Sequence, residues 1–176
     1  MGPMNSYLWI NMPEQQLYLI DNGIISGVYP VSTARKGPGE ILGSGCTPRG
    51  WHIIRAKIGH GLPAGAVLVG RRPTGEIYEA ELALRYPDRD WILSRILWLS
   101  GLEMGFNRLG EVDTFRRFIY IHGSPDHLID GKPGSCGCIR MRNADIIELF
   151  DKVIAGTRVY ISDQNQLPPV SSLAPR

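Results

Sequence analysis

Short runs of apolar and β-branched residues, separated by turn residues, fill the first half of the chain. Such runs are typical of β-strands, which need only about four to eight residues between turn signals. Pro13-Glu14 and Asp21-Asn22-Gly23 separate the first three runs and predict an antiparallel β-meander. The glycine- and proline-rich segment 35–50 predicts a long loop, a type of segment that is often functional. Strands are expected at 7–12, 15–20, 24–31, 51–58, 66–69 and 77–82.

A later apolar segment has helical spacing and predicts an amphipathic helix over about 89–100 that covers the sheet. The segment 102–112 that follows is rich in glycine. Either the region serves only as the covering helix, or 102–112 forms a lid or wall beside a binding site, in which Asn107 and Arg108 would contact a substrate.

A second helix is expected near the C-terminal end, at about 144–155. Asn143 is a suitable N-cap for it, and Gly156 lies just past its end. Strands are expected before and after it, at 117–121 and 157–161. These patterns predict a mainly β fold with few, short helices.

Composition limits the functions that fit this chain. With 176 residues, of which 43% are hydrophobic and 20% charged, the chain is long enough for one domain that buries roughly 70% of its unfolded surface. The net charge of +2 is too small to favour nucleic acid or an anionic membrane as a partner. Three cysteines do not form a disulfide framework, and no run reaches the ~18 apolar residues of a membrane span.

The expected domain covers residues 4–162. Residues 1–3 are candidates for a cloning remnant, and residues 163–176, rich in proline and serine, are expected to be a flexible tail. The N-terminus has no basic start followed by an apolar run, which a secretory signal would show. A cytoplasmic location is therefore expected, or a periplasmic one if a leader was trimmed from the sequence.

A histidine and a cysteine flank the loop with the strongest candidate chemistry. Cys138 comes sixteen residues after His122. A free thiol, with a pKa near ~8.5, is mostly protonated at neutral pH, so an imidazole is needed to take its proton and return it to a leaving group. Glycine at position 137 lets the backbone turn tightly and aim the amides of Cys136, Gly137 and Cys138 at a developing oxyanion. Arg140 would favour the thiolate and bind a substrate carboxylate.

The segment 119–141 resembles the signature of the L,D-transpeptidase (YkuD-type) family, with His-Gly, a loop, and then Ser-x-Gly-Cys-Ile-Arg-Met. Many members of that family have a second histidine before the Gly-Cys pair, where this chain has Cys136. The likeness covers nearly the whole domain and extends to 14–19, 29–33, 47–50, 143–150 and 156–159.

The resemblance implies a YkuD-like mixed β-sheet sandwich or barrel, and an enzyme that acts on peptidoglycan stem tetrapeptides without a cofactor or a metal. It implies that Cys138 is the nucleophile, His122 the base, and Gly123 the carbonyl that orients the imidazole. Ser135 and Arg140 would bind substrate. Cys138 would cleave the L,D bond before a terminal D-alanine and form a thioester, and carbapenems would acylate the same thiol. Water as acceptor gives an L,D-carboxypeptidase, which the expected location favours, and an amine gives transpeptidation.

Two other classes of function stay open. His122, His127, Cys136 and Cys138 are four residues of zinc-binding type, but zinc-binding cysteines usually have about two to four residues between them, and here only Gly137 intervenes. A peptidoglycan-binding domain without activity is the other class, and it has no need for the full set of reactive groups. His52, His60 and Cys46 are expected to be structural or incidental.

Overall fold

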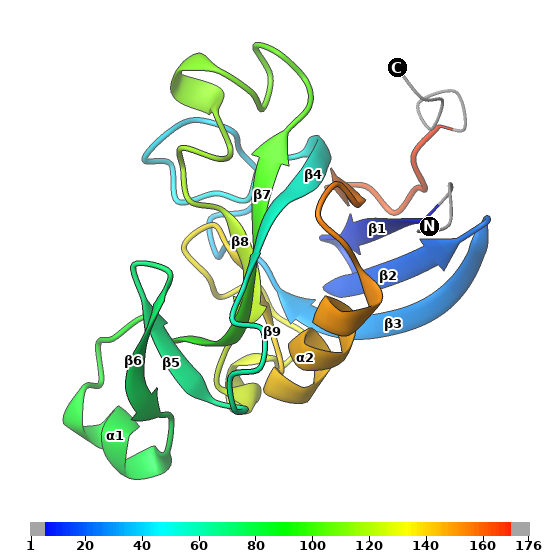
Figure 1. The fold of residues 1–176 in the computed structure, drawn as a ribbon. Coiled ribbons are helices and arrows are strands. Elements are labelled where there is room, and N and C mark those ends of the chain that lie inside the picture. Colours follow the sequence, from blue (N-terminus) through cyan, green and yellow to red (C-terminus); the bar gives the residue numbers. More distant parts are fainter. Residues whose placement is uncertain (1–5, 170–176) are drawn as a thin grey trace.

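Eight strands pair side by side into a closed barrel in the computed structural model, which describes residues 6–169 (Figure 1). The order around the barrel is β4-β10-β1-β2-β3-β9-β8-β7, and the pairing of β4 with β7 closes it. The pairs β1–β10 and β8–β9 are parallel, and the other pairs are antiparallel, so the expected mixed, mainly β fold is confirmed. The barrel strands are β1 (Ser6–Asn11), β2 (Gln16–Asp21), β3 (Ile24–Ser32), β4 (Gly50–Ile58), β7 (Ile92–Gly101), β8 (Tyr120–Gly123), β9 (Ile139–Met141) and β10 (Arg158–Ser162).

A hairpin and a short helix extend from β7 outside the barrel, drawn in green in Figure 1. The hairpin consists of β5 (Ala66–Val69) and β6 (Arg72–Ile77), and β5 pairs with β7. The strand predicted at 77–82 is wrong, because β6 ends where that segment begins and α1 (Ala80–Arg85) follows. The sequence of α1, AELALR, consists of strong helix formers, which explains the difference.

The helix predicted over 89–100 is also wrong, because this segment forms β7. Most of its side chains are buried on both faces of the sheet: Leu97 and Leu99 point into the barrel, and Ile96 packs on the outside. A strand covered on both faces has a nearly continuous apolar sequence, which periodicity alone does not distinguish from a buried helix.

The second expected helix is present as α2 (Asn143–Lys152), and Ile146, Leu149 and Phe150 are its buried residues. It ends three residues before the predicted position 155, because Val153 already has an extended backbone. The predicted cap is wrong as well. Asn143 is the first residue inside the helix, and its side-chain amide donates to the carbonyl oxygen of Ser124 (3.1 Å).

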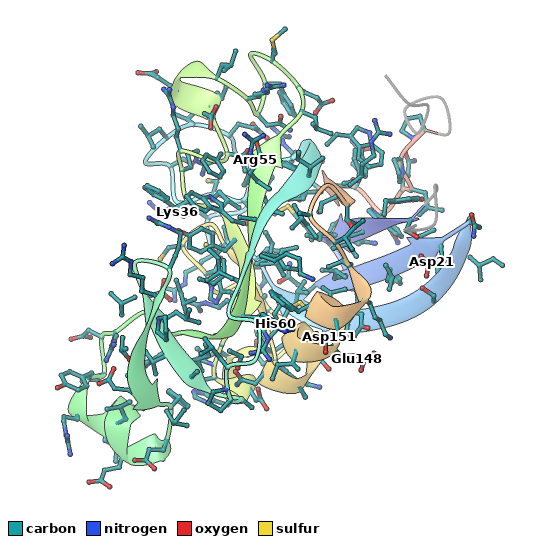
Figure 2. All side chains as sticks on the ribbon, in the orientation of Figure 1. Asp21, Lys36, Arg55, His60, Glu148 and Asp151 are labelled. Atoms are coloured by element: carbon teal, nitrogen blue, oxygen red, sulfur yellow. The ribbon has the colours of Figure 1, made fainter. Side chains whose placement is uncertain are left out.

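The barrel interior forms the main core, to which β-strands and α2 contribute. Figure 2 shows side chains filling the space that the ribbon leaves open. Residues 1–3 and the end of the predicted tail, 170–176, lie outside the described residues. Within 163–169, Asp163 pairs with Arg49 (2.9 Å) and Asn165 accepts a hydrogen bond from Asn11 (2.8 Å), which attaches this segment to the barrel.

Candidate active site

His122 lies on β8, and Cys138 immediately precedes β9, the parallel partner of β8. The register pairs Ile121 with Ile139 and His122 with Arg140. Ile121 and Ile139 belong to the barrel core. Because side chains alternate between the faces of a strand, His122, Cys138 and Arg140 share the outer face of the barrel. Cys138 and His122 are therefore diagonal neighbours on one surface.

The thiol of Cys138 is held by β8 and by the turn before it. Its sulfur accepts a hydrogen bond from the amide of Tyr120 (3.3 Å), and it donates to the carbonyl oxygen of Phe118 (3.4 Å). It packs beside the outer apolar cluster that contains Ile96 and Tyr120. Burial raises the pKa of Cys138 to about 12, although the Tyr120 amide and Arg140 act in the opposite direction. The resting group is thus a thiol, because burial outweighs the positive charge that was expected to favour the thiolate.

The imidazole of His122 is fixed in one tautomer. Nδ1 lies 2.7 Å from the carbonyl oxygen of Gly123. A carbonyl can only accept, so Nδ1 carries the hydrogen and Nε2 has a free lone pair in the neutral ring. Burial lowers the pKa of His122 below its usual value, which keeps the ring neutral and able to accept a proton.

No direct hydrogen bond joins the thiol of Cys138 to the imidazole of His122 among residues 6–169. Proton transfer between them therefore requires the thiol to leave its hydrogen bond with Phe118. Such contacts often tighten only when substrate is bound.

The turn that presents Cys138 is fixed by two hydroxyl groups. Ser135 Oγ donates to the carbonyl oxygen of Cys138 (2.5 Å) and accepts from the amide of Gly137 (3.1 Å). Thr47 Oγ1 donates to the carbonyl oxygen of Gly137 (2.8 Å). Gly137 has φ of +130°, and a Cβ there would lie 3.2 Å from the carbonyl oxygen of Cys46, so this position requires glycine. In this structure the hydroxyl of Ser135 is used inside the turn.

The three amides predicted to form an oxyanion hole differ in availability. The amide of Gly137 is bonded to Ser135 Oγ. The amides of Cys136 and Cys138 have no hydrogen-bond partner in the described part of the chain, so they are free to donate to a substrate oxygen.

Arg140 lies beside the imidazole and is already paired. It donates to a carboxylate oxygen of Asp90 (2.9 Å) and to the carbonyl oxygen of Gly134 (3.2 Å). Its side chain is only 13% exposed. A substrate carboxylate at Arg140 would have to compete with Asp90, a residue that the sequence did not single out.

Gly123 permits a close approach between β8 and β7. The pairing of these strands shifts between Leu93 and Ile96, and Ser94 has a positive φ of 67°. A Cβ at Gly123 would lie 2.3 Å from the carbonyl oxygen of Leu93. Only glycine fits here, and its carbonyl is the group that orients His122.

The tip of the β5–β6 hairpin lies over the strand that holds the thiol. Arg71 donates to the hydroxyl of Tyr120 (3.0 Å), and its guanidinium lies 4.6 Å above the Trp98 ring and 5.2 Å from the Phe118 ring. Phe118 has a left-handed backbone with φ of 56°, which also explains why β8 begins at Tyr120 and not at the predicted position 117. The sequence could have indicated that Tyr120 lies near the site, because it is two residues before His122 on one strand and therefore shares its face. No sequence pattern indicates the same for Arg71.

The other predicted residues lie apart from this cluster. Asn107 is fully buried and donates to the carbonyl oxygen of Trp51 (3.1 Å), so the expectation that it contacts substrate is wrong. Arg108 is exposed, and its role stays a prediction. His52 bonds to Thr114 Oγ1 (3.0 Å), and burial lowers its pKa to about 4.

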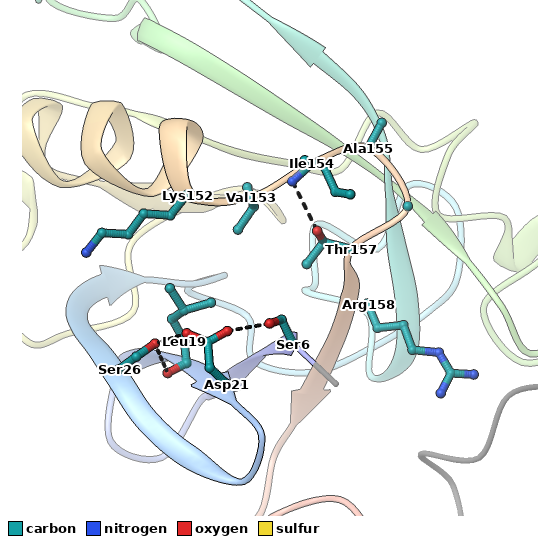
Figure 3. A pocket seen from close by; sticks show the side chains of 11 residues that line it. Ser6, Leu19, Asp21, Ser26, Lys152, Val153, Ile154, Ala155, Thr157 and Arg158 are labelled. Carbon is teal, nitrogen blue, oxygen red and sulfur yellow. Dashed lines mark hydrogen bonds between the residues drawn. The ribbon is translucent and has the colours of Figure 1, made fainter. Parts of the chain in front are cut away.

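Two open cavities differ in their relation to the site. A cleft of about 460 Å³ is lined by Ser135, Cys136 and Arg140 of the catalytic segment, although not by the side chain of Cys138. A larger cavity of about 650 Å³ lies between the end of α2 and strands β1 and β2 (Figure 3) and shares no lining residue with the cleft. Of these two, the smaller cleft is the one that adjoins the turn presenting Cys138.

No group of three or more His, Cys, Asp or Glu side chains in residues 6–169 is arranged to hold a metal ion. His127 is exposed to solvent. The described helices are also too short or too polar to cross a membrane. The zinc-module interpretation therefore has no supporting geometry within these residues.

A half-buried thiol, a neutral imidazole on the adjacent strand and backbone amides without a partner at the turn lie on the outside of the β-barrel, and these are the groups that a cysteine acyl transfer uses. The chain belongs to the YkuD family, whose model, described as the L,D-transpeptidase catalytic domain, matches residues 5–161.

Named relatives agree with this assignment. A Bacillus subtilis protein named "Putative L,D-transpeptidase YqjB" is 28% identical over 164 residues, which cover 93% of this chain and 75% of that protein. The Escherichia coli protein named "Probable L,D-transpeptidase ErfK/SrfK" is 52% identical over 48 residues, 27% of this chain and 16% of its own length.

Solved L,D-transpeptidases have the same fold. The enzyme from Xylanimonas cellulosilytica aligns with a TM-score of 0.53 at 19% identity, over 90% of this chain and 60% of that one. L,D-transpeptidase 3 from Mycobacterium tuberculosis aligns with a TM-score of 0.56 at 16% identity, over 90% and 61%. This chain thus spans about 60% of the length of these solved proteins.

Proposed function

We propose that this chain catalyses acyl transfer on peptidoglycan stem peptides, with Cys138 attacking the carbonyl of an L,D bond before a terminal D-alanine. The observation that supports the proposal is that His122 on β8 and Cys138, next to β9, share the outer face of the barrel. Family membership supplies the substrate class.

The residues have separate roles in the proposed reaction. The Cys138 thiol loses its proton to Nε2 of His122 as its sulfur forms a bond to the substrate carbonyl carbon. The amides of Cys136 and Cys138 stabilise the oxyanion. His122 then returns the proton to the leaving amine of D-alanine, and a thioester on Cys138 remains.

The acceptor of the acyl group determines the product. Water gives L,D-carboxypeptidase activity, which the sequence led us to favour. An amine gives a cross-link or an exchanged D-amino acid, and the names of the relatives support this outcome. Mass spectrometry of a tetrapeptide muropeptide incubated with the protein distinguishes them: loss of D-alanine alone indicates hydrolysis, and dimers or exchanged products indicate transfer.

The three cysteines allow a matched test of the nucleophile. Solved structures include LD transpeptidase LdtMt1 in complex with imipenem and L,D-transpeptidase 3 from Mycobacterium tuberculosis in complex with a faropenem-derived adduct. We expect a carbapenem to form one covalent adduct with this chain, which Cys138→Ala abolishes and Cys46→Ala and Cys136→Ala retain. An adduct that persists in Cys138→Ala, or no release of D-alanine by the native chain, would contradict the proposal.

A further inference from the structure

Two basic residues, Arg35 and Lys36, line the cleft beside the turn that presents Cys138. Gly45 and residues 87–91 line the same cleft. The side chains of Arg35 and Lys36 are exposed, and Lys36 lies at the periphery of the molecule in Figure 2.

The backbone connects these two residues to the nucleophile. The amide of Arg35 donates to the carbonyl oxygen of Ser135 (2.9 Å), and Ala34 forms a parallel bridge with Ser135. The hydroxyl of the same Ser135 bonds to the carbonyl oxygen of Cys138. The position of Arg35 relative to Cys138 is therefore set by two consecutive hydrogen bonds.

The positively charged side chains that line the cleft differ in whether they have an ion-pair partner. Arg140 is paired with Asp90 (2.9 Å), and Arg89 is paired with Glu76 (3.0 Å). The side chains of Arg35 and Lys36 form no ion pair or hydrogen bond within residues 6–169. Arg35 and Lys36 therefore present two positive charges without an ion-pair partner to a cleft whose lining also includes the exposed Asp88.

We propose that Arg35 and Lys36 bind a carboxylate of the acyl-donor peptide, one other than its terminal carboxylate, and so select an acidic stem peptide over its amidated form. This inference rests on the proposed function for the identity of the peptide. An arginine can bind a carboxylate through two parallel hydrogen bonds, and a lysine adds a point charge. A carboxamide offers neither the charge nor the second acceptor oxygen.

A pair of peptides that differ at one group tests this. The probes are L-Ala-γ-D-Glu-L-Lys-D-Ala and the same peptide with the glutamate α-carboxylate replaced by a carboxamide. Binding is measured by calorimetry on Cys138→Ala, so that the result does not depend on turnover. We expect the carboxylate peptide to bind about tenfold more tightly at low ionic strength, and the difference to decrease with salt.

Substitutions then assign the effect to the two residues. In the Cys138→Ala background, Arg35→Gln and Lys36→Gln should each reduce the preference to about threefold or less. Arg55→Gln removes the same charge from the exposed surface of β4, outside the cleft, and should retain the full preference. Circular dichroism verifies that each variant is folded.

Two results would overturn the inference: equal affinity for the two peptides in Cys138→Ala, or a preference that both cleft substitutions leave unchanged. Failure of the proposed function has a different signature, since it would appear as no D-alanine release from either peptide by the native chain, whatever their affinities.

Discussion

The backbone amide of Tyr120 lies 3.3 Å from the sulfur of Cys138, so the strand that carries His122 also contacts the thiol of Cys138. Two residues further along β8, His122 takes its orientation from Gly123. Thiol and imidazole are thus positioned by one short strand, and both are neutral at rest because burial raises the pKa of Cys138 and lowers that of His122.

This neutral pair predicts the pH dependence of acylation. The competent form exists above the pKa of His122, which is below its ordinary value of about 6.5, and below the pKa of Cys138 at about 12. We expect the rate of carbapenem acylation to increase with pH through the acidic range and then to be constant from pH 7 to 9. His122→Gln should lower this constant rate by a factor of about 10² to 10⁴. The remaining rate should increase with pH between 7 and 9, because only spontaneous ionisation of the thiol then supplies thiolate.

Stopped-flow measurement of the acylation rate from pH 4 to 10 checks this prediction. A native rate that climbs about tenfold per pH unit between 7 and 9 would mean that the thiol ionises before it reacts. In that case His122 would not be the proton acceptor.

Thr47 is predicted to support the nucleophile without touching substrate. Its hydroxyl donates to the carbonyl oxygen of Gly137 (2.8 Å) and accepts from the amide of Ala34 (2.9 Å). Thr47→Val keeps the shape and loses both bonds, which should cost about 1–3 kcal/mol of stability and slow acylation about tenfold through misplacement of the turn. Thr74→Val, on the exposed hairpin, is the control and should leave the acylation rate unchanged. Equal rates in the two variants would show that Thr47 does not position the turn.

Gly123 is predicted to tolerate no side chain, because the carbonyl oxygen of Leu93 would lie 2.3 Å from a Cβ. Gly123→Ala should reduce the free energy of unfolding by about 2–4 kcal/mol, measured by urea denaturation. Gly27→Ala is the matched control, since its Cβ would meet only the far end of the Tyr29 side chain at 3.1 Å. We expect it to cost less than about 1 kcal/mol. If Gly123→Ala were as stable as Gly27→Ala, β7 and β8 would not be packed as closely as the structure shows.

The sequence predicts the local parts of this molecule better than the long-range ones. Strands β1 to β5 are recognisable because turn residues separate them, and the segment from His122 to Arg140 carries the thiol and the base within one loop. β7 is mistaken for a helix because burial on both faces removes the alternation that marks a strand. The contacts of Cys138 with Phe118 and of Arg140 with Asp90 depend on barrel closure, which no local pattern encodes.

His52 should make the stability of the barrel sensitive to mild acid. It is fully buried, and both ring nitrogens are hydrogen bonded, to Gly50 and Thr114 (3.0 Å each). Burial lowers its pKa to about 4, while the unfolded chain keeps a value near 6.5. The unfolded state therefore binds the proton first as the pH falls, and the stability present above pH 6.5 is lost progressively down to pH 4.

The linkage relation gives about 2 kcal/mol for the part of this loss that His52 causes between pH 7 and pH 5. Urea denaturation at these two pH values should therefore show a smaller pH-dependent loss in His52→Gln than in the native chain, by about that amount. His60→Gln is the control, because His60 is exposed, and it should retain the native pH dependence. The comparison uses differences between pH values, so any cost of the glutamine at neutral pH cancels. An unchanged pH dependence in His52→Gln would mean that water reaches this imidazole in the folded state and that the contact with Thr114 is not maintained in solution.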